Sequence, residues 1–174
     1  MNENIDVLFS QEVLENRIKE IADKINEEYK GKKLHMVCVL RGAVFFFTEL
    51  CKHINVPVTM DFLVCSSYGS GTTTSGEVKI VKDLADPIAG LDVILVEDIV
   101  DTGVTLNALK PMLMTRKPAS LKIATMLDKP SRRRVVLEPD YCAFEVDDLF
   151  VIGYGLDYDQ KYRNLPFIGV YKGE

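Results

Sequence analysis

A short aliphatic run followed by two acids and a glycine turn constrains the fold more than any other feature. Val93 to Val96 is β-branched and aliphatic throughout, which favours a strand buried on both faces. Glu97 and Asp98 follow at its end, and Asp101-Thr102-Gly103-Val104-Thr105 forms a turn rich in small and hydroxyl residues. Apolar residues then recur at helical spacing as far as Leu113. This order of strand, turn and helix predicts a mainly parallel α/β sheet.

The turn suits a ligand that carries both hydroxyl groups and a phosphate. Ligands of open α/β sheets bind outside the carboxyl ends of the strands, and a glycine turn that opens a helix attracts phosphate. The two acids would repel a phosphate but can accept hydrogen bonds from ribose hydroxyls. The stretch therefore predicts a site for a ribose 5-phosphate, in which Asp101 is not needed for binding and could take part in the reaction. The alternative is an ordinary turn in which Asp101 caps the helix. The Walker A and Rossmann glycine patterns are both absent.

Length, charge and cysteine usage exclude several classes of protein. With 174 residues, the chain is long enough for one domain with a sizeable core. A net charge of −5 argues against nucleic acid as a partner, and no apolar run approaches the length of a membrane span. The polar, acidic start is unlike a signal peptide. The scattered cysteines fit neither a zinc site nor a disulfide framework and predict a cytoplasmic location; they are Cys38, Cys51, Cys65 and Cys142.

Further strands and helices alternate along the chain. Ser10 is expected to cap an amphipathic helix that ends near Gly31, and an apolar helix is predicted to begin near Ala43. Strands are predicted at 34–40, 56–64, 77–81 and 120–127. Three strands end in turns that could share one crevice: Leu40-Arg41, Glu97-Asp98 and Asp128-Lys129.

The stretch from Glu97 to Thr105 resembles the phosphoribosyl-pyrophosphate signature of the type I phosphoribosyltransferases, most closely in the branch that acts on 6-oxopurines. Matching landmarks continue in the expected order from about Leu34 to Tyr171. The resemblance implies a single α/β domain over residues 1–174, with a mainly parallel central sheet flanked by helices. It places the core at about 10–140, a flexible lid loop at 66–76, and a small hood mostly at 141–174 together with the N-terminal residues.

The resemblance also implies a role for each residue at the sugar-donor end. Glu97 and Asp98 would bind the ribose, and Asp101 would be the general base. Arg163 would reach the pyrophosphate, and Asp157 would help to hold Mg²⁺, with Glu97 and Asp98 as further candidate ligands. The 5-phosphate would lie on Thr102, Gly103, Val104 and Thr105, and the pyrophosphate loop would be Leu40, Arg41 and Gly42, with a cis peptide between Leu40 and Arg41. Without the resemblance, Arg41 and Arg163 could be surface arginines.

At the base end, Lys129 would contact the purine 6-oxo group, Phe150 would stack on the ring and Val151 would read the purine edge through its backbone. Ser67 and Tyr68 match a Ser-Tyr pair on the lid. Taken alone, Lys129 could be a solvated lysine, Phe150 a core residue and the lid a plain hairpin. One departure is Leu149, which is apolar where some relatives carry lysine.

The implied activity is Mg²⁺-dependent transfer of 5-phosphoribosyl from phosphoribosyl pyrophosphate to N9 of hypoxanthine or guanine, in a homodimer or homotetramer without nucleic acid or membrane. Alternatives are a phosphoribosyltransferase for xanthine or a pyrimidine, including RNA-binding regulators of pyrimidine synthesis, a non-catalytic nucleotide sensor, or a P-loop phosphotransferase. Asp101, Lys129 and Phe150 favour the purine enzyme. The run Arg132-Arg133-Arg134 is expected to be a solvated or subunit-contact patch.

Overall fold

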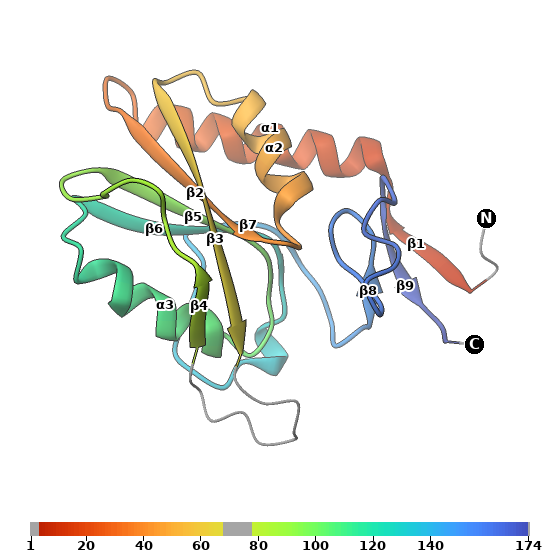
Figure 1. Cartoon of the computed structure of the whole chain (residues 1–174). Helices are drawn as coiled ribbons and strands as arrows, with labels where there is room; N and C mark the ends of the chain where they lie inside the picture. Colours follow the sequence, from red (N-terminus) through yellow and green to blue (C-terminus); the bar gives the residue numbers. More distant parts are fainter. Residues whose placement is uncertain (1–3, 68–77, 174) are drawn as a thin grey trace.

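The computed structural model describes residues 4–67 and 78–173, which form two sheets and three α-helices (Figure 1). The strands are β1 Ile5–Phe9, β2 Leu34–Leu40, β3 Val58–Ser67, β4 Val78–Lys82, β5 Asp92–Val100, β6 Ser120–Asp128, β7 Tyr141–Glu145, β8 Val151–Ile152 and β9 Ile168–Tyr171. The helices are α1 Gln11–Glu28, α2 Val44–Lys52 and α3 Val104–Met114, with a 3-10 turn, η1, at Pro130–Arg132.

The larger sheet is mainly parallel, as the sequence predicts. Its six strands lie in the order β4-β3-β2-β5-β6-β7, and among them only β4 runs antiparallel to its neighbour. From β2 the chain first moves outward to β3 and then returns to place β5 on the other side of β2. The strand order therefore reverses between β2 and β5. In open α/β sheets, such a reversal leaves a crevice at the carboxyl ends of the two strands.

The sheet separates two hydrophobic layers, because successive side chains of a strand point to opposite faces. On β2, Met36 and Cys38 pack with α1 and α2, whereas Val37 and Val39 pack with α3. Figure 1 shows the same division, with α1 and α2 on one face and α3 on the other. Burial on both faces accounts for the continuous apolar sequence of the central strands.

Helix α1 begins and ends close to its predicted bounds. Its N-cap is Ser10, whose Oγ accepts a hydrogen bond from the backbone N–H of Val13 at 3.4 Å. The helix ends at Glu28, and Gly31 then adopts a positive φ of 76°. The residues that α1 buries against the sheet are Leu14, Ile18, Ala22, Ile21 and Ile25.

The central strand is longer than predicted. The aliphatic run suggested a strand that ends at Val96, but β5 continues to Val100. The pairing partner explains the difference, because β6 places Thr125 opposite Glu97 and Leu127 opposite Ile99. The two acids therefore lie within a hydrogen-bonded strand, not in the turn after it.

The smaller sheet joins the two ends of the described chain. Its strand order is β1-β9-β8, all antiparallel, with Ile5 opposite Tyr171 and Val151 opposite Val170. Figure 1 shows this sheet beside the main sheet. The segment predicted as the hood, 141–174, begins with β7. This strand pairs with β6 and therefore belongs to the main sheet, not to the small one.

Candidate active site

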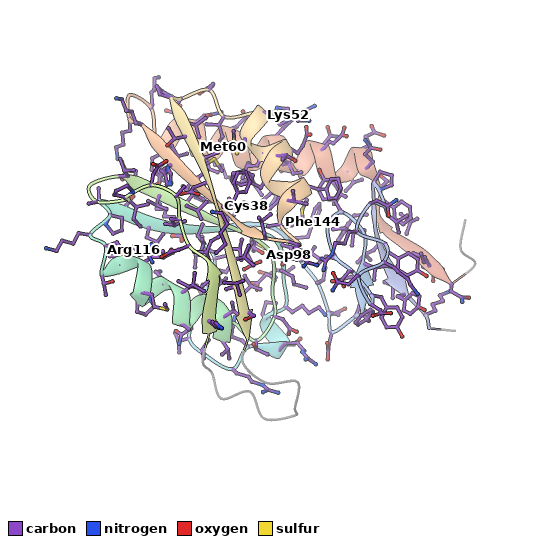
Figure 2. All side chains as sticks on the ribbon, viewed as in Figure 1. Cys38, Lys52, Met60, Asp98, Arg116 and Phe144 are labelled. Atoms are coloured by element: carbon purple, nitrogen blue, oxygen red, sulfur yellow. The ribbon has the colours of Figure 1, made fainter. Side chains whose placement is uncertain are left out.

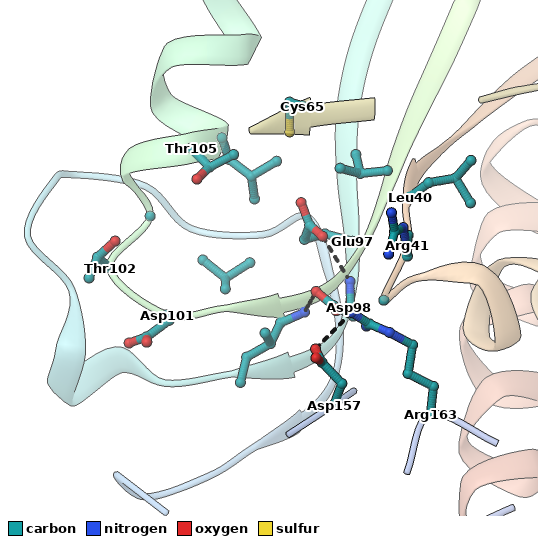
Figure 3. Close-up of a pocket in the computed structure, with 16 residues that line it drawn as sticks. Leu40, Arg41, Cys65, Glu97, Asp98, Asp101, Thr102, Thr105, Asp157 and Arg163 are labelled. Atoms are coloured by element: carbon teal, nitrogen blue, oxygen red, sulfur yellow. Dashed lines mark hydrogen bonds and ion pairs between the residues drawn. The ribbon is translucent and has the colours of Figure 1, made fainter. Parts of the chain in front are cut away.

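A pocket of about 320 Å³ lies at the carboxyl ends of β2 and β5, where the strand order reverses (Figure 3). Figure 2 shows Asp98 at this end of the sheet, on the side where the small sheet lies. The pocket gathers most of the residues predicted for the sugar donor. They are Leu40, Arg41, Gly42, Glu97, Asp98, Asp101, Thr102, Gly103, Thr105, Asp157 and Arg163. The pocket therefore brings together segments that are far apart in the sequence.

The acid pair is held in place by the backbone of β5. Glu97 is only 9 % exposed, and its Oε1 accepts the N–H of Asp98 at 3.2 Å. Oδ1 of Asp98 accepts the N–H of Ile99 at 2.7 Å. Burial, with the neighbouring charge of Asp98, raises the pKa of Glu97 well above its usual value, and burial also raises the pKa of Asp98. A positive charge placed beside this pair would favour the ionised forms.

The turn after β5 opens α3 as a phosphate-binding loop would. Gly103 is the N-cap residue and has a φ of 77°, a conformation that favours glycine. The hydroxyl of Thr102 accepts the backbone N–H of Val104 at 3.4 Å. Thr102, Gly103 and Thr105 line the pocket, while Val104 begins the helix without lining it. The positive end of the α3 dipole therefore lies at the pocket wall.

The segment after β2 approaches Asp98 so closely that only glycine fits. The Leu40–Arg41 peptide is cis, as expected. A Cβ on Gly42 would lie 1.4 Å from Oδ2 of Asp98. Gly155 meets the same segment from the other side, because its Cβ would lie 1.9 Å from the carbonyl oxygen of Gly42. Close contacts at Gly42 therefore fix the spacing of the segment after β2, the side chain of Asp98 and the 153–157 segment.

Asp157 and Arg163 form an ion pair of 2.8 Å at the rim of the pocket. Nη1 of Arg163 also donates to the carbonyl oxygen of Gly155 at 2.7 Å. Sequence reasoning missed Gln160, whose Oε1 accepts a hydrogen bond from Nη1 of Arg41 at 2.9 Å. Its backbone N–H also donates to Oδ2 of Asp157 at 2.8 Å. Gln160 thus links two arginine-bearing segments that are about 120 residues apart, and no local motif marks it.

A second pocket of about 460 Å³ adjoins the first and shares Asp98, Asp101 and Asp157 with it. The residues predicted to bind the base line this second pocket; they are Lys129, Phe150 and Val151. Lys129 is buried and its Nζ donates to the carbonyl oxygen of Leu149 at 2.6 Å, so it is not a solvated lysine. The ring of Phe150 is 53 % exposed and meets Tyr158 edge-on at 5.8 Å, which rules out core packing.

The expectation of a solvated arginine patch is wrong for Arg133, which is largely buried, whereas Arg132 and Arg134 are exposed as expected. Arg132 pairs with Asp101 at 2.9 Å. Arg133 forms an ion pair with Asp128 and donates to the carbonyl oxygens of Val100 and Asp101 at 3.1 and 2.6 Å. The cause lies in the fold, because η1 follows β6 and turns these side chains toward the end of the neighbouring β5. Arg134 remains exposed.

Two predicted positions lie at the edge of what the structure describes. Ser67 is the last residue of β3, and Tyr68 lies outside the described residues. The same holds for most of the predicted lid at 66–76.

The carboxylates of the first pocket have the donor chemistry that Mg²⁺ prefers. In the described ranges, however, no three acids, cysteines or histidines converge to form a metal site. Asp157 and the acid pair can therefore supply only part of a coordination shell, and a ligand would have to supply the other oxygens. None of the described helices has the length and apolar character needed to cross a bilayer, and all four cysteines are free.

A mainly parallel sheet that presents an acid pair beside a glycine turn at its strand reversal is the arrangement expected of the type I phosphoribosyltransferases. The sequence profile described as Phosphoribosyl transferase domain matches residues 5–159. The hypoxanthine-guanine phosphoribosyltransferase of Streptococcus thermophilus is 53% identical over 168 residues, which cover 97% of this chain and 93% of that protein. The one of Bacillus subtilis is 47% identical over 166 residues, which cover 95% and 92%.

A crystal structure of a hypoxanthine phosphoribosyltransferase from Staphylococcus aureus superposes with a TM-score of 0.96 and 43% sequence identity, covering 99% of this chain and 94% of that one. The chain therefore belongs to the hypoxanthine-guanine phosphoribosyltransferase family.

Proposed function

We propose that this protein is a purine-salvage enzyme that transfers 5-phosphoribosyl from phosphoribosyl pyrophosphate to N9 of hypoxanthine or guanine. The products are inosine or guanosine monophosphate and pyrophosphate. The observation that carries the proposal is the position of Asp101, which lines both pockets. A carboxylate at this junction can face a sugar donor on one side and a base on the other.

At the donor end, the residues would bind and orient the sugar. Thr102, Gly103, Thr105 and the start of α3 would hold the 5-phosphate. Glu97 and Asp98 would accept hydrogen bonds from the ribose hydroxyls. As the bond between C1 and the pyrophosphate breaks, positive charge develops on the ribose, and the raised pKa values of the acid pair make its ionisation respond to that charge.

At the departing group, Arg41 and Arg163 would donate charge-assisted hydrogen bonds to pyrophosphate oxygens. Arg41 contacts Gln160 and Arg163 contacts Asp157, and both arginines line the first pocket. Asp157 and the acid pair would help to hold Mg²⁺, which when bound would supply positive charge opposite the negative pyrophosphate oxygens.

At the base end, Asp101 would accept the proton that leaves N7 as N9 bonds to C1. Lys129 would donate to the 6-oxo group, Phe150 would stack on the ring and Val151 would offer backbone groups to the purine edge. Adenine carries an amino group at the same position, and that group would face the Lys129 donor without an acceptor. Ser67 and Tyr68 would belong to a lid that excludes water from the donor.

The free cysteines support a reducing compartment, and we infer a cytoplasmic enzyme. Membership of this family favours a homodimer or homotetramer. The net charge of −5 supports the absence of a nucleic-acid partner.

The test is pyrophosphate release from phosphoribosyl pyrophosphate and Mg²⁺, with hypoxanthine, guanine, xanthine, adenine and uracil offered in parallel. We expect turnover with hypoxanthine and guanine, and rates lower by roughly 10²-fold or more with adenine. Turnover with uracil alone would overturn the base-site assignments and leave the donor site standing. No turnover with any base, despite donor binding, would identify a nucleotide sensor.

A further inference from the structure

Arg132 joins two carboxylates that flank the second pocket, where we propose that the base binds. Its Nε donates to Oδ1 of Asp101 at 2.9 Å, and its Nη1 donates to Oδ2 of Asp148 at 3.1 Å. Asp101 follows β5, whereas Asp148 precedes Phe150 on the opposite wall of the same pocket. The guanidinium of Arg132 therefore connects the wall that carries Asp101 with the wall that carries Phe150.

The chemistry of arginine suits this position. A guanidinium is planar and carries several donors in a fixed arrangement, so it can bind two carboxylates at once and hold both in one geometry. Lys129 supports the same wall, since its Nζ bonds to the Leu149 carbonyl and lies 3.8 Å from Oδ1 of Asp148. Two cations thus hold the 148–149 segment from the end of β6.

The ion pair is suited to orienting a side chain more than to stabilising the fold. The Arg132 and Asp101 side chains are 42% and 39% exposed, so water screens their attraction. The bond uses only Oδ1 of Asp101, and no hydrogen bond to Oδ2 occurs in the described part of the chain. The second oxygen is therefore available to a ligand while the first is held.

We propose that Arg132 is a positioning residue that holds Asp101 by one oxygen and directs the other toward N7 of the purine. This inference rests on the proposed function. In the step itself, the N7–H bond breaks, its electron pair stays on the purine ring, and the proton moves to Asp101. Asp101 loses its charge at that moment, and Asp148 keeps the Arg132 guanidinium paired.

The first experiment compares Arg132→Gln with the native enzyme in steady-state turnover of hypoxanthine. Misplacement of a catalytic group by about 1 Å can cost on the order of 10²-fold. We expect kcat to fall roughly 10- to 100-fold and the KM for phosphoribosyl pyrophosphate to change less than about 3-fold. Arg134→Gln is the matched control, because its exposed side chain forms none of the ion pairs within the described ranges. A kcat for Arg132→Gln within about 2-fold of native would overturn the proposal.

A double-mutant cycle separates positioning from a merely structural role. If Arg132 acts through Asp101, then adding Arg132→Gln to Asp101→Asn should lower kcat by less than about 3-fold more. A further loss as large as in the native background would show that Arg132 acts elsewhere and would overturn the proposal. If Asp101→Asn alone retains native kcat, the general-base assignment fails instead, and the two failures are thus distinguished.

Chemical rescue keeps the test informative if Arg132→Gln folds poorly. We expect guanidinium ion at non-denaturing concentration to restore part of the kcat of Arg132→Ala, with sodium ion at equal ionic strength as the control. Arg132→Lys keeps the charge without the planar donor set and should have intermediate activity. If guanidinium and sodium changed the kcat of Arg132→Ala equally, and Arg132→Lys had native kcat, the planar donor set of Arg132 would have no role and the proposal would fail.

Discussion

At the scale of single residues, the carboxylates of Glu97, Asp98 and Asp101 lie close together near the end of β5 but in different surroundings. Glu97 and Asp98 are enclosed at the end of β5, and burial raises the pKa of each. Asp101 lies three residues further on, where its side chain is 39% exposed and paired with Arg132. Burial thus distinguishes the two enclosed acids, which we propose to bind the sugar, from the more exposed Asp101, which we propose to accept the proton. Enzymes commonly assign different tasks to neighbouring carboxylates in this way.

The role of Asp101 predicts a selective loss of turnover. Asn at this position keeps an oxygen that can accept the Arg132 hydrogen bond but cannot accept a proton from N7. We expect Asp101→Asn to lower kcat by about 10²–10⁴-fold with little change in donor binding. Steady-state kinetics with hypoxanthine, together with direct titration of phosphoribosyl pyrophosphate, would check both parts. Near-native kcat would contradict the assignment.

The close approach of Gly42 to Asp98 predicts that a single methyl group disrupts the donor site. In Gly42→Ala the new Cβ would lie 1.4 Å from Oδ2 of Asp98, so the carboxylate must move. We expect kcat/KM for phosphoribosyl pyrophosphate to fall by roughly 10²-fold, because displacement of about 1 Å can cost that much. The measurement is kcat/KM at fixed hypoxanthine, with circular dichroism to confirm folding. A folded variant with native kcat/KM would show that Asp98 can move without consequence.

At the scale of elements, Asp61 ties the turn after β4 to the middle of β3. It is 3 % exposed, and its carboxylate accepts the backbone N–H groups of Phe62, Ala85 and Asp86 at 2.7, 2.8 and 3.3 Å. Burial raises the pKa of Asp61, but these hydrogen bonds and the nearby charge of Lys82 together lower it by more, so the pKa lies below its usual value. The turn that leads toward β5 is therefore held by an ionised side chain.

This arrangement predicts a pH-dependent stability difference. In Asp61→Asn one acceptor oxygen becomes an amide that faces a backbone donor, and we expect a loss of about 1–3 kcal/mol in the free energy of unfolding at pH 7. Because the folded pKa of Asp61 is lowered, its contribution is complete above the unfolded pKa of about 4. It is lost as the pH falls through the folded pKa.

Urea unfolding of the native protein and of Asp61→Asn from pH 7 to pH 3 would measure this difference. The gap between the two proteins should narrow below about pH 4. The exposed neighbour Asp86 supplies the control, since Asp86→Asn removes a charge without removing a buried acceptor. A gap that stays constant with pH would contradict the assigned role of the carboxylate.

The elements that local sequence can specify were predicted well. The helix capped by Ser10, the strand Leu34–Leu40 and the parallel sheet followed from periodicity and residue type, and the structure confirms them. The end of β5 was missed because its last residues owe their strand conformation to pairing with β6, which no local pattern reveals.

The candidate site shows the same division between local and long-range information. Motifs identified the acid pair and the phosphate loop, and the structure brings both into one pocket. The contacts of Arg132, Arg133 and Gln160 were not predicted, because each joins segments that are far apart in the sequence. Their partners become neighbours only after the sheet and η1 have formed.

At the scale of the whole molecule, a nucleotide product would bridge the two pockets. The first pocket lies at the end of the main sheet, while Val151, which lines the second pocket, belongs to the small sheet. We therefore expect guanosine monophosphate to stabilise both sheets together. At about one hundred times its dissociation constant, a ligand adds about 2.7 kcal/mol, which corresponds to a rise in Tm of roughly 5–10 °C for a chain of this length.

Thermal unfolding followed by circular dichroism would check this expectation. Adenosine monophosphate at the same concentration is the control, because its 6-amino group would oppose Lys129, and its shift in Tm should be smaller. Equal shifts with the two nucleotides would contradict the proposed contact with the 6-oxo group.

The pairing of β1 with β9 has a consequence for how the protein is made. Ile5 is synthesised about 165 residues before its partner Tyr171. At typical rates of about 5–20 residues per second, β1 would wait on the order of 10–30 s for a partner. The parallel sheet and its phosphate loop need no residue later than Glu145 and can assemble during that interval. Asp157, Arg163 and the strands of the small sheet would join this framework later in synthesis, so neither pocket would have its full lining until they are made.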